Sequence, residues 1–357
     1  MTVLAVRRAQ ELCEFCPKMC RFACPVSEVT HREALTPWAK VSLAAMTARA
    51  PDASAAQAFA GCTGCLRCSV YCAHDNDVPS VLYAARAATV RAGVAPEAFA
   101  SLPGAFSRQG HAEERDLAAV HRALEAGAQP AGAGALLFPG CDALAQGGEL
   151  ARLALQVSAR LRAPLTLAPE EALCCGLKLR EGGHPELYSA HRSRLRRALG
   201  AQKKPLSLVF LQPACAQDWD LPEGSVVEHI TTYLARALVA LPEERRPAPL
   251  PESLVFHDPC QLARGLQEVT APRALLAASV RDLREPLRSG VDTSCCGAGG
   301  LLPRSMPEAA QAMAQARRAE LGPQAVSCSP ACSAALGAEE LLSVLARWLA
   351  QQQGATP

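Results

Sequence analysis

Residues 62–72 read CTGCLRCSVYC and place four cysteines within eleven positions. The gaps between them are two, two and three residues. Such short gaps bring several thiolates onto one loop, where they can hold one metal centre together. The chain has seventeen cysteines, and each belongs to one of four groups. Cysteines that only fill a core would not gather in this way, so the sequence predicts metal binding.

The run at residues 62–72 has the spacing of bacterial ferredoxins, which hold [4Fe-4S] clusters. A zinc site more usually shows two separated pairs. The first group resembles the same motif, with one extra residue between its second and third cysteines and Pro25 after the fourth. In two-cluster ferredoxins the fourth cysteine of each run binds the other cluster. The resemblance therefore implies two crossed sets, which are Cys13, Cys16, Cys20 and Cys72 for cluster 1 and Cys62, Cys65, Cys68 and Cys24 for cluster 2.

The composition narrows the class of protein. With 20% charged residues, 4% aromatic residues and a formal net charge of +2, the chain has neither the profile of a disordered protein nor that of a nucleic-acid-binding surface. Its first residues are charged where a secretory signal would be apolar, and no apolar run of about eighteen residues occurs. We expect a cytoplasmic protein without a transmembrane segment. In that reducing compartment, clustered cysteines serve metal ligation rather than disulfides.

A length of 357 residues suggests two to four domains. Residues 1–92 hold the two close-spaced groups, and an Ala-rich stretch from Pro37 to Ala60 predicts helix, interrupted at Pro51. Residues 93–134 read as a connector with two helical segments, ending in a run of small residues at 127–134.

An internal repeat follows the connector. Cys141 corresponds to Cys260, the pair at 174–175 to the pair at 295–296, and Cys215 to Cys332, with offsets of 119, 121 and 117 residues. The apolar runs before Cys141 and Cys260 also match. A sustained offset of this kind indicates one duplicated unit.

Each repeat alternates short β-rich runs with helical stretches. Leu206–Leu211 reads as a buried strand and Tyr188–Leu199 as an amphipathic helix. This alternation predicts α/β units with parallel sheets. The boundary falls at Leu241–Pro251, where four prolines in eleven residues fit neither a helix nor a central strand. We predict an α+β protein, with a mainly helical two-cluster ferredoxin-type domain at 1–92 and tandem α/β domains at 135–245 and 252–350.

The repeated pattern, a cysteine, then Cys-Cys-Gly, then one or two further cysteines at intervals of over thirty residues, is similar to the CCG domain of heterodisulfide reductase subunits. Over nearly the whole chain the order of motifs also resembles the iron–sulfur subunits of glycolate oxidase, anaerobic glycerol-3-phosphate dehydrogenase and lactate-utilisation complexes. The resemblance implies that a complete unit holds a noncubane [4Fe-4S] cluster through five cysteines. The second repeat supplies five, which are Cys260, Cys295, Cys296, Cys328 and Cys332.

The first repeat is incomplete, because Leu211 stands where Cys328 stands in the second. Its four cysteines, Cys141, Cys174, Cys175 and Cys215, can hold a cluster or a zinc ion, or can remain empty. His257, three residues before Cys260, is the candidate catalytic residue. It can donate a hydrogen bond to a cluster sulfur or relay a proton, and the alternative is a histidine that caps a turn.

Two functions follow from the resemblance. In the first, the chain is the electron-transfer subunit of a cytoplasmic oxidoreductase and relays electrons between an FAD-containing dehydrogenase subunit and a quinone or another acceptor. A quinone-reactive membrane subunit can then hold it at the inner face of the membrane. In the second, the C-terminal CCG site itself reduces a disulfide, as in heterodisulfide reductases. A third class, a structural zinc protein with closed thiolate sites, explains neither the ferredoxin spacing nor the cysteine pairs.

Overall fold

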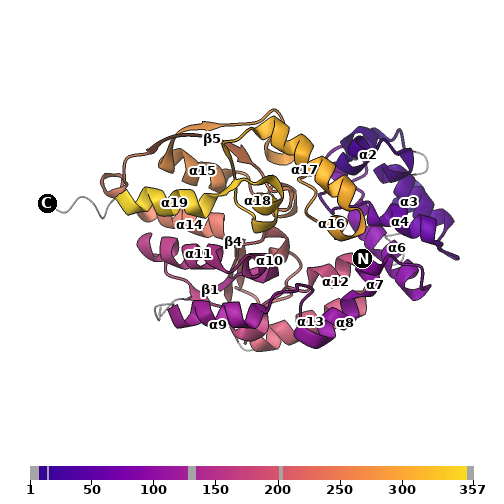
Figure 1. Cartoon of the computed structure of the whole chain (residues 1–357), viewed down its shortest axis with the longest axis horizontal. Coiled ribbons are helices and arrows are strands. Elements are labelled where there is room, and N and C mark those ends of the chain that lie inside the picture. Colours follow the sequence, from indigo (N-terminus) through magenta and orange to yellow (C-terminus); the bar gives the residue numbers. More distant parts are fainter. Residues whose placement is uncertain (1–7, 14–15, 128–133, 201–203, 352–357) are drawn as a thin grey trace. The chain divides into compact units, whose positions relative to one another are not determined.

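The computed structural model describes residues 8–13, 16–127, 134–200 and 204–351. It divides into two compact units (Figure 1). Unit 1 comprises Met1–Ala112, Gly176–Ala190 and Val291–Ala319, and unit 2 comprises Glu113–Cys175, His191–Gly290 and Glu320–Pro357. The helices and strands together confirm a mixed fold, and the predicted domain limits remain a prediction.

Unit 1 is helical. All strands among the described residues belong to unit 2. The predicted helix at 37–60 is confirmed as two helices, α3 (Pro37–Met46) and α4 (Ala53–Ala60), with the break at Pro51. Asp52 caps α4, because its carboxylate accepts a hydrogen bond of 2.7 Å from the backbone N–H of Ala55. The other helices of this part are α2 (Pro25–Thr30), α5 (Arg67–Val70), α6 (Val78–Arg91), α7 (Glu97–Ala100) and α8 (Leu102–Gln109).

Unit 1 also takes in one segment from each repeat. The segment after Cys175 begins with α12 (Leu177–Glu181), and the segment after Gly290 contains α16 (Leu302–Ser305) and most of α17 (Pro307–Leu321). Of the predicted connector, α7 and α8 lie in unit 1 and α9 (Leu117–Gly127) lies in unit 2, while residues 128–133 of the small-residue run lie outside the described residues.

Arg86 of α6 holds these segments of unit 1 together. Its side chain is fully buried, and its guanidinium donates hydrogen bonds of 2.7–3.2 Å to five backbone carbonyl groups. The accepting residues are Phe59, Ala60, Cys62, Glu181 and Gly300. The backbone of Gly300 also lies close to the backbone of Cys62. Gly300 has a φ of +64°, and a Cβ atom there would lie 2.1 Å from the Cys62 carbonyl oxygen. A residue other than glycine would therefore separate this loop from Cys62.

Two parallel four-stranded sheets form the frame of unit 2. The first has the order β2-β1-β3-β4 and the second β6-β5-β7-β8, so corresponding strands occupy the same places. The first sheet consists of β1 (Ala135–Phe138), β2 (Thr166–Leu167), β3 (Ser207–Phe210) and β4 (Val226–His229). The second consists of β5 (Leu250–His257), β6 (Val280–Arg284), β7 (Ala325–Ser327) and β8 (Glu339–Glu340). The shared order supports the duplication that the cysteine offsets predict.

The strand and helix predicted in the first repeat are confirmed as β3 and α13 (Pro185–Ala198). The prediction for Leu241–Pro251 was wrong at its end, because Leu250 and Pro251 belong to β5, which is a central strand. The register of β5 against β6 shifts between Leu250 and Ser253. Pro251 falls within this irregularity, where a ladder hydrogen bond from its nitrogen is not needed.

One core serves both sheets of unit 2. It includes Leu137 and Val209 from the first repeat, and Phe256, Val326 and Trp348 from the second. Four helices carry most of the packing, which are α11 (Glu149–Arg160), α14 (Ile230–Ala240), α15 (Thr270–Ser279) and α19 (Leu341–Ala350).

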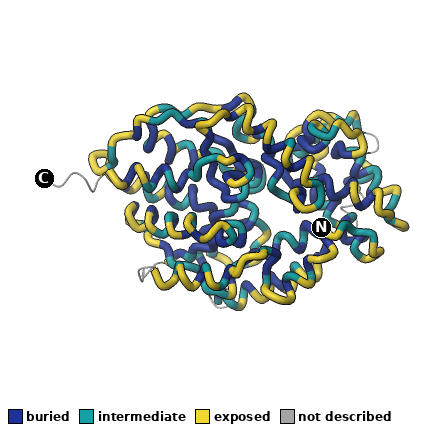
Figure 2. The backbone as a smooth tube through the Cα atoms, in the orientation of Figure 1, coloured by how far each residue is buried: buried dark blue, intermediate teal, exposed yellow. Residues whose placement is uncertain are grey.

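These helices pack in pairs, each with one helix from either repeat: α11 packs on α19, and α14 packs on α15. Figure 1 shows the four stacked together. Buried and exposed positions alternate along them (Figure 2), as expected for helices with one face in a core. Because α11 corresponds to α15 and α14 to α19 in the repeat, each pair joins non-equivalent helices. The two repeats therefore bury their apolar faces against each other. Among the residues that the structure describes, no helix has the length and apolar character needed to span a bilayer.

Arg86→Met should lower the free energy of unfolding by about 3 kcal/mol or more, because it leaves several buried carbonyl groups without a donor. Urea unfolding followed by circular dichroism under anaerobic conditions measures the change. Arg91→Met, at the exposed end of the same helix, is the matched control and should change it by less than about 0.5 kcal/mol. Equal effects of the two substitutions would contradict this role of Arg86.

Candidate metal centres

The first set of ferredoxin cysteines gathers within unit 1. Cys20 lies in η1 (Met19–Ala23), and Cys72 follows α5. Burial raises the pKa of Cys20 to about 11, and nearby Cys13, Cys72 and Cys16 add to the rise. These thiols therefore lie close enough to repel one another as thiolates, although Cys72 is more than fifty positions away in the sequence.

Asn76 ties the two motifs together at this set. Its side-chain amide donates to Cys13 Sγ at 3.3 Å, and its backbone N–H donates to Cys72 Sγ at 3.4 Å. The backbone N–H of Lys18 lies 3.4 Å from Cys16 Sγ. Donors aimed at sulfur are typical of iron–sulfur sites, where they stabilise the charge on thiolate ligands. Sequence reasoning missed Asn76, whose position shortly after Cys72 gave no signal.

The second set surrounds a small cavity of unit 1. Cys24, Cys62, Cys65 and Cys68 all line it, together with apolar side chains and Lys40. Burial raises the pKa of Cys68 well above its usual value, and the neighbouring thiols of Cys65, Cys62 and Cys24 raise it further. The structure thus brings Cys24 of the first motif to three cysteines of the second.

Lys40 of α3 is the charged residue of this cavity. Its side chain is 2% exposed, and Nζ donates to the Gly61 carbonyl oxygen at 2.6 Å and to Cys24 Sγ at 3.8 Å. Burial alone would lower the pKa of Lys40, but the negative charges available at Cys24, Cys62 and Cys68 outweigh it, so that the pKa is raised. Lys40 therefore keeps its positive charge beside the second set.

Both sets fit a [4Fe-4S] cluster by the chemistry of their donors. Each offers four thiols, and each has hydrogen-bond donors directed at sulfur, such as the backbone N–H of Gly64 at 3.5 Å from Cys62 Sγ. Buried thiols with raised pKa values resist ionisation until a metal takes the place of the proton. The assignment of individual cysteines to clusters remains a prediction.

The loop with the Cys-Cys pair of the second repeat also lies in unit 1. Cys295 Sγ lies 3.5 Å from the Thr63 hydroxyl oxygen, within the second ferredoxin motif. Asp292 accepts hydrogen bonds from Arg67 at 3.1 Å and from the Tyr71 hydroxyl at 2.7 Å. A Cβ atom at Gly299 would lie 2.7 Å from the Thr63 carbonyl oxygen. The two loops are therefore in direct contact on both sides of Cys295.

The four cysteines of the first repeat meet inside unit 2. Cys141 lies in α10 (Gly140–Ala145) after β1, and Cys215 lies in η4 (Pro213–Ala216) after β3. The carboxyl ends of adjacent parallel strands, where ligands bind in open α/β sheets, therefore bring these two together. Hydrogen bonds join the Cys174 thiol to Cys141 and Cys175, and the Cys215 thiol to Cys175.

This buried group has the donors for zinc or for an iron–sulfur cluster. Its thiols are at most 5% exposed, and hydrogen bonding and burial raise the pKa of Cys174 and Cys215 well above the usual value. Two carboxylates also approach, because ligand atoms of Glu113, Cys141 and Asp142 lie within 4.8 Å of one another. The cysteine spacing gave no indication of Glu113 or Asp142.

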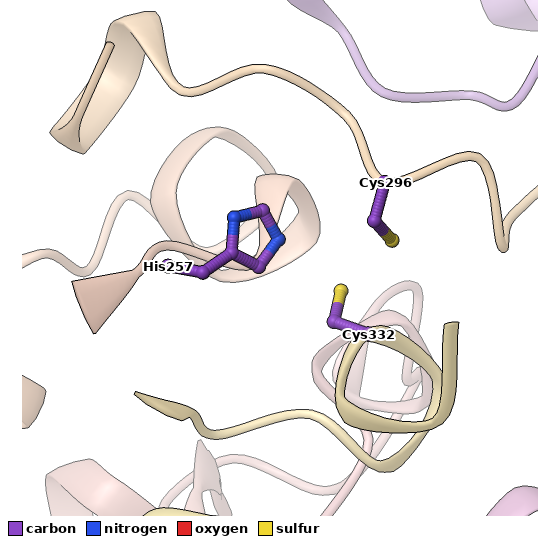
Figure 3. A group of neighbouring side chains, drawn as sticks. All are labelled: His257, Cys296 and Cys332. Carbon is purple, nitrogen blue, oxygen red and sulfur yellow. The ribbon is translucent and has the colours of Figure 1, made fainter. Parts of the chain in front are cut away.

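Unit 2 places three cysteines of the second repeat around the ends of β5 and β7. Cys260 follows β5, Cys328 follows β7, and Cys332 lies in α18 (Pro330–Leu336). The strands pair with His257 opposite Ser327. A ring nitrogen of the buried His257 lies within 4.8 Å of Cys332 Sγ, and Figure 3 shows the imidazole and the thiol on their two elements. Because Cys295 and Cys296 belong to unit 1, the complete five-cysteine set remains a prediction.

Asp258 fixes the segment that carries His257. It is 2% exposed and forms a two-pronged ion pair with Arg273 of α15, at 2.8 and 2.9 Å. The backbone N–H of Gly290 donates to the same carboxylate at 2.7 Å. Asp258 therefore holds its loop in place, and sequence reasoning missed its partner Arg273. The role of His257 in proton transfer remains a prediction.

The cysteine-rich CCG domain model matches residues 254–337. One of the subunits of dihydromethanophenazine:CoB–CoM heterodisulfide reductase from Methanosarcina barkeri is 30% identical over 276 residues, which are 72% of this chain and 66% of that protein. Its counterpart from Methanosarcina mazei is 26% identical over 275 residues, with the same shares. A probable membrane-anchored ferredoxin from Chromohalobacter salexigens is 46% identical over 52 residues, 15% of this chain and 8% of that protein.

The chain thus spans 66% of the length of each of these heterodisulfide reductase subunits. The match to the CCG model covers Cys260, Cys328 and Cys332 as well as the Cys-Cys pair of the second repeat. These similarities agree with the expectation from the cysteine pattern: the chain belongs to the family of heterodisulfide reductase-like, CCG-domain iron–sulfur subunits.

Proposed function

We propose that this protein is the electron-transfer subunit of an oxidoreductase. It relays single electrons between an FAD-containing dehydrogenase partner and a quinone or another acceptor. By the family resemblance, the partner oxidises a 2-hydroxy acid or glycerol 3-phosphate, and a membrane subunit holds the acceptor. The proposed cofactors are one [4Fe-4S] cluster on each ferredoxin set and a noncubane cluster on the five cysteines of the second repeat.

The observation that carries this proposal is the contact of Cys295 with Thr63. It joins the loop of the second ferredoxin set to a predicted ligand of the C-terminal CCG site. When bound, iron–sulfur clusters accept and release one electron at a time. The protein chain then has to keep successive clusters at short range. The backbone contacts between the loops at 62–67 and 292–300 and the Arg67–Asp292 ion pair support this proposal.

The sequence has no dinucleotide fingerprint or phosphate loop, so that hydride chemistry on an organic substrate is assigned to the partner.

Reduction of a disulfide is the second candidate function. Two observations favour it, namely the similarity to heterodisulfide reductase subunits and the approach of His257 to Cys332. In this version the two electrons from the relay and two protons convert one disulfide into two thiols, and His257 supplies a proton.

The relay predicts that anaerobically purified protein speeds electron transfer from photoreduced free flavin to a soluble quinone, above the rate of flavin alone. Cys65→Ser should lower this protein-dependent rate at least tenfold and remove iron from one site. Val70→Ala, an exposed change within the same motif, is the control and should leave rate and iron content unchanged. A Cys65→Ser protein with full iron and the wild-type rate would contradict the relay.

The disulfide reaction predicts that chemically reduced protein releases two thiols for every two electrons from a mixed disulfide of two small thiols. His257→Gln should slow thiol release at least tenfold without changing the rate of quinone reduction, since a soluble quinone takes its protons from solvent and only the disulfide reaction uses His257. Thiol titration after removal of the reductant measures the release. If fully reduced wild-type protein released no thiols, the disulfide reaction would be excluded and the relay would remain as the proposed function.

A further inference from the structure

Two buried cations lie beside the second ferredoxin set. Lys40 Nζ is 3.8 Å from Cys24 Sγ, and the Arg86 guanidinium donates to the Cys62 carbonyl oxygen at 2.7 Å. Their side chains are 2% and 0% exposed, so water screens their charges poorly. Both residues belong to unit 1, and both come from helices outside the cysteine motifs.

The surroundings of the first set differ. Among the residues that the structure describes there, a neutral group, the side-chain amide of Asn76, donates to Cys13 Sγ at 3.3 Å. Lys18 approaches this set with its backbone N–H, while its ammonium group lies over the ring of Trp38, 4.0 Å from the centroid. Three cysteines of this set, Cys16, Cys20 and Cys72, are only partly buried, against two of the second set, Cys62 and Cys68. The electrostatic environments of two sites with the same donor chemistry are therefore unequal.

We propose that Lys40, assisted by Arg86, gives the second set the higher reduction potential of the two ferredoxin sites, so that an electron moves from the first set to the second. The inference rests on the proposed function and adds a direction to it. One electron leaves the first site and one is taken up at the second, where Lys40 and Arg86 stabilise the added negative charge. The electron then resides at the site whose loop contacts Cys295.

A purely structural role is the competing explanation for Lys40. Its hydrogen bond of 2.6 Å to the Gly61 carbonyl oxygen closes the turn between α4 and the second motif. A glutamine at this position can still donate a hydrogen bond but carries no charge. Arginine keeps the charge on a larger side chain. These two substitutions separate the effect of charge from the effect of the hydrogen bond.

The experiment is an EPR-monitored redox titration of the holoprotein. Cys16→Ser and Cys65→Ser, each expected to lack one site, assign the two signals. In the wild-type protein, the signal lost in Cys65→Ser should have the higher midpoint potential. In Lys40→Gln, the equilibrium constant for reduction of that site should fall at least tenfold, which is about 59 mV for a one-electron couple. Lys40→Arg should stay near the wild-type value.

Two controls accompany the titration. The midpoint of the first site is the internal control and should not move in Lys40→Gln. Lys204→Met, which removes an exposed lysine of unit 2, should change neither midpoint. If the substitutions at Lys40 prevent assembly of the second site, the order of the two midpoints in the wild-type protein still tests the proposed direction of electron transfer.

Each outcome has a distinct meaning. Two clusters with the lower potential at the second site, or unchanged midpoints in Lys40→Gln, would overturn the role of Lys40 and leave the relay in place. A wild-type protein that binds no cluster at the ferredoxin sets would overturn the relay itself, and the role of Lys40 with it.

Discussion

The hydrogen bonds of the Arg86 guanidinium are the interaction on which unit 1 depends. A single buried side chain binds carbonyl groups of the α4 end, the second ferredoxin motif and a segment from each repeat. Backbone carbonyl groups buried without donors are costly, so Arg86 stabilises the packing of these segments against one another. The consequence is chemical as well as structural, because the bond to Gly300 holds the Cys-Cys loop of the second repeat against the ferredoxin motif.

The two repeats share one sheet topology but differ in the loops that carry their cysteines. Both repeats build the same parallel sheet and place cysteines after the first and third strands of their chain order. Loops at the carboxyl ends of parallel strands can vary without disturbing the sheet. In the first repeat this variation replaces one cysteine with Leu211, which is buried, and leaves a compact group of four thiols within unit 2. In the second repeat the loop with the Cys-Cys pair extends into unit 1, toward the ferredoxin motif.

Features fixed by short spacing could be predicted from the sequence, and features fixed by tertiary contact could not. Cysteine gaps of two and three residues limit the geometry of a loop, so the two ferredoxin motifs and their expected crossing followed from spacing and resemblance. Periodicity indicated β3 and α13 for the same reason. Lys40 and Arg86 gave no signal, because they lie in helical stretches where a charged residue usually faces solvent. The prediction failed at Pro251 because a proline excludes a central strand only where its nitrogen must donate a hydrogen bond. The register of β5 shifts at this point, which removes that need.

The two proposed cluster sites of unit 1 depend most on the exchange of fourth cysteines between the two ferredoxin motifs. The most direct test compares the iron content and EPR spectra of four anaerobically purified variants, Cys16→Ser, Cys72→Ser, Cys65→Ser and Cys24→Ser. With crossed ligands, Cys72→Ser loses the same signal as Cys16→Ser, and Cys24→Ser loses the same signal as Cys65→Ser. Pairing by sequence neighbourhood, with Cys72→Ser matching Cys65→Ser and Cys24→Ser matching Cys16→Ser, would contradict the exchange.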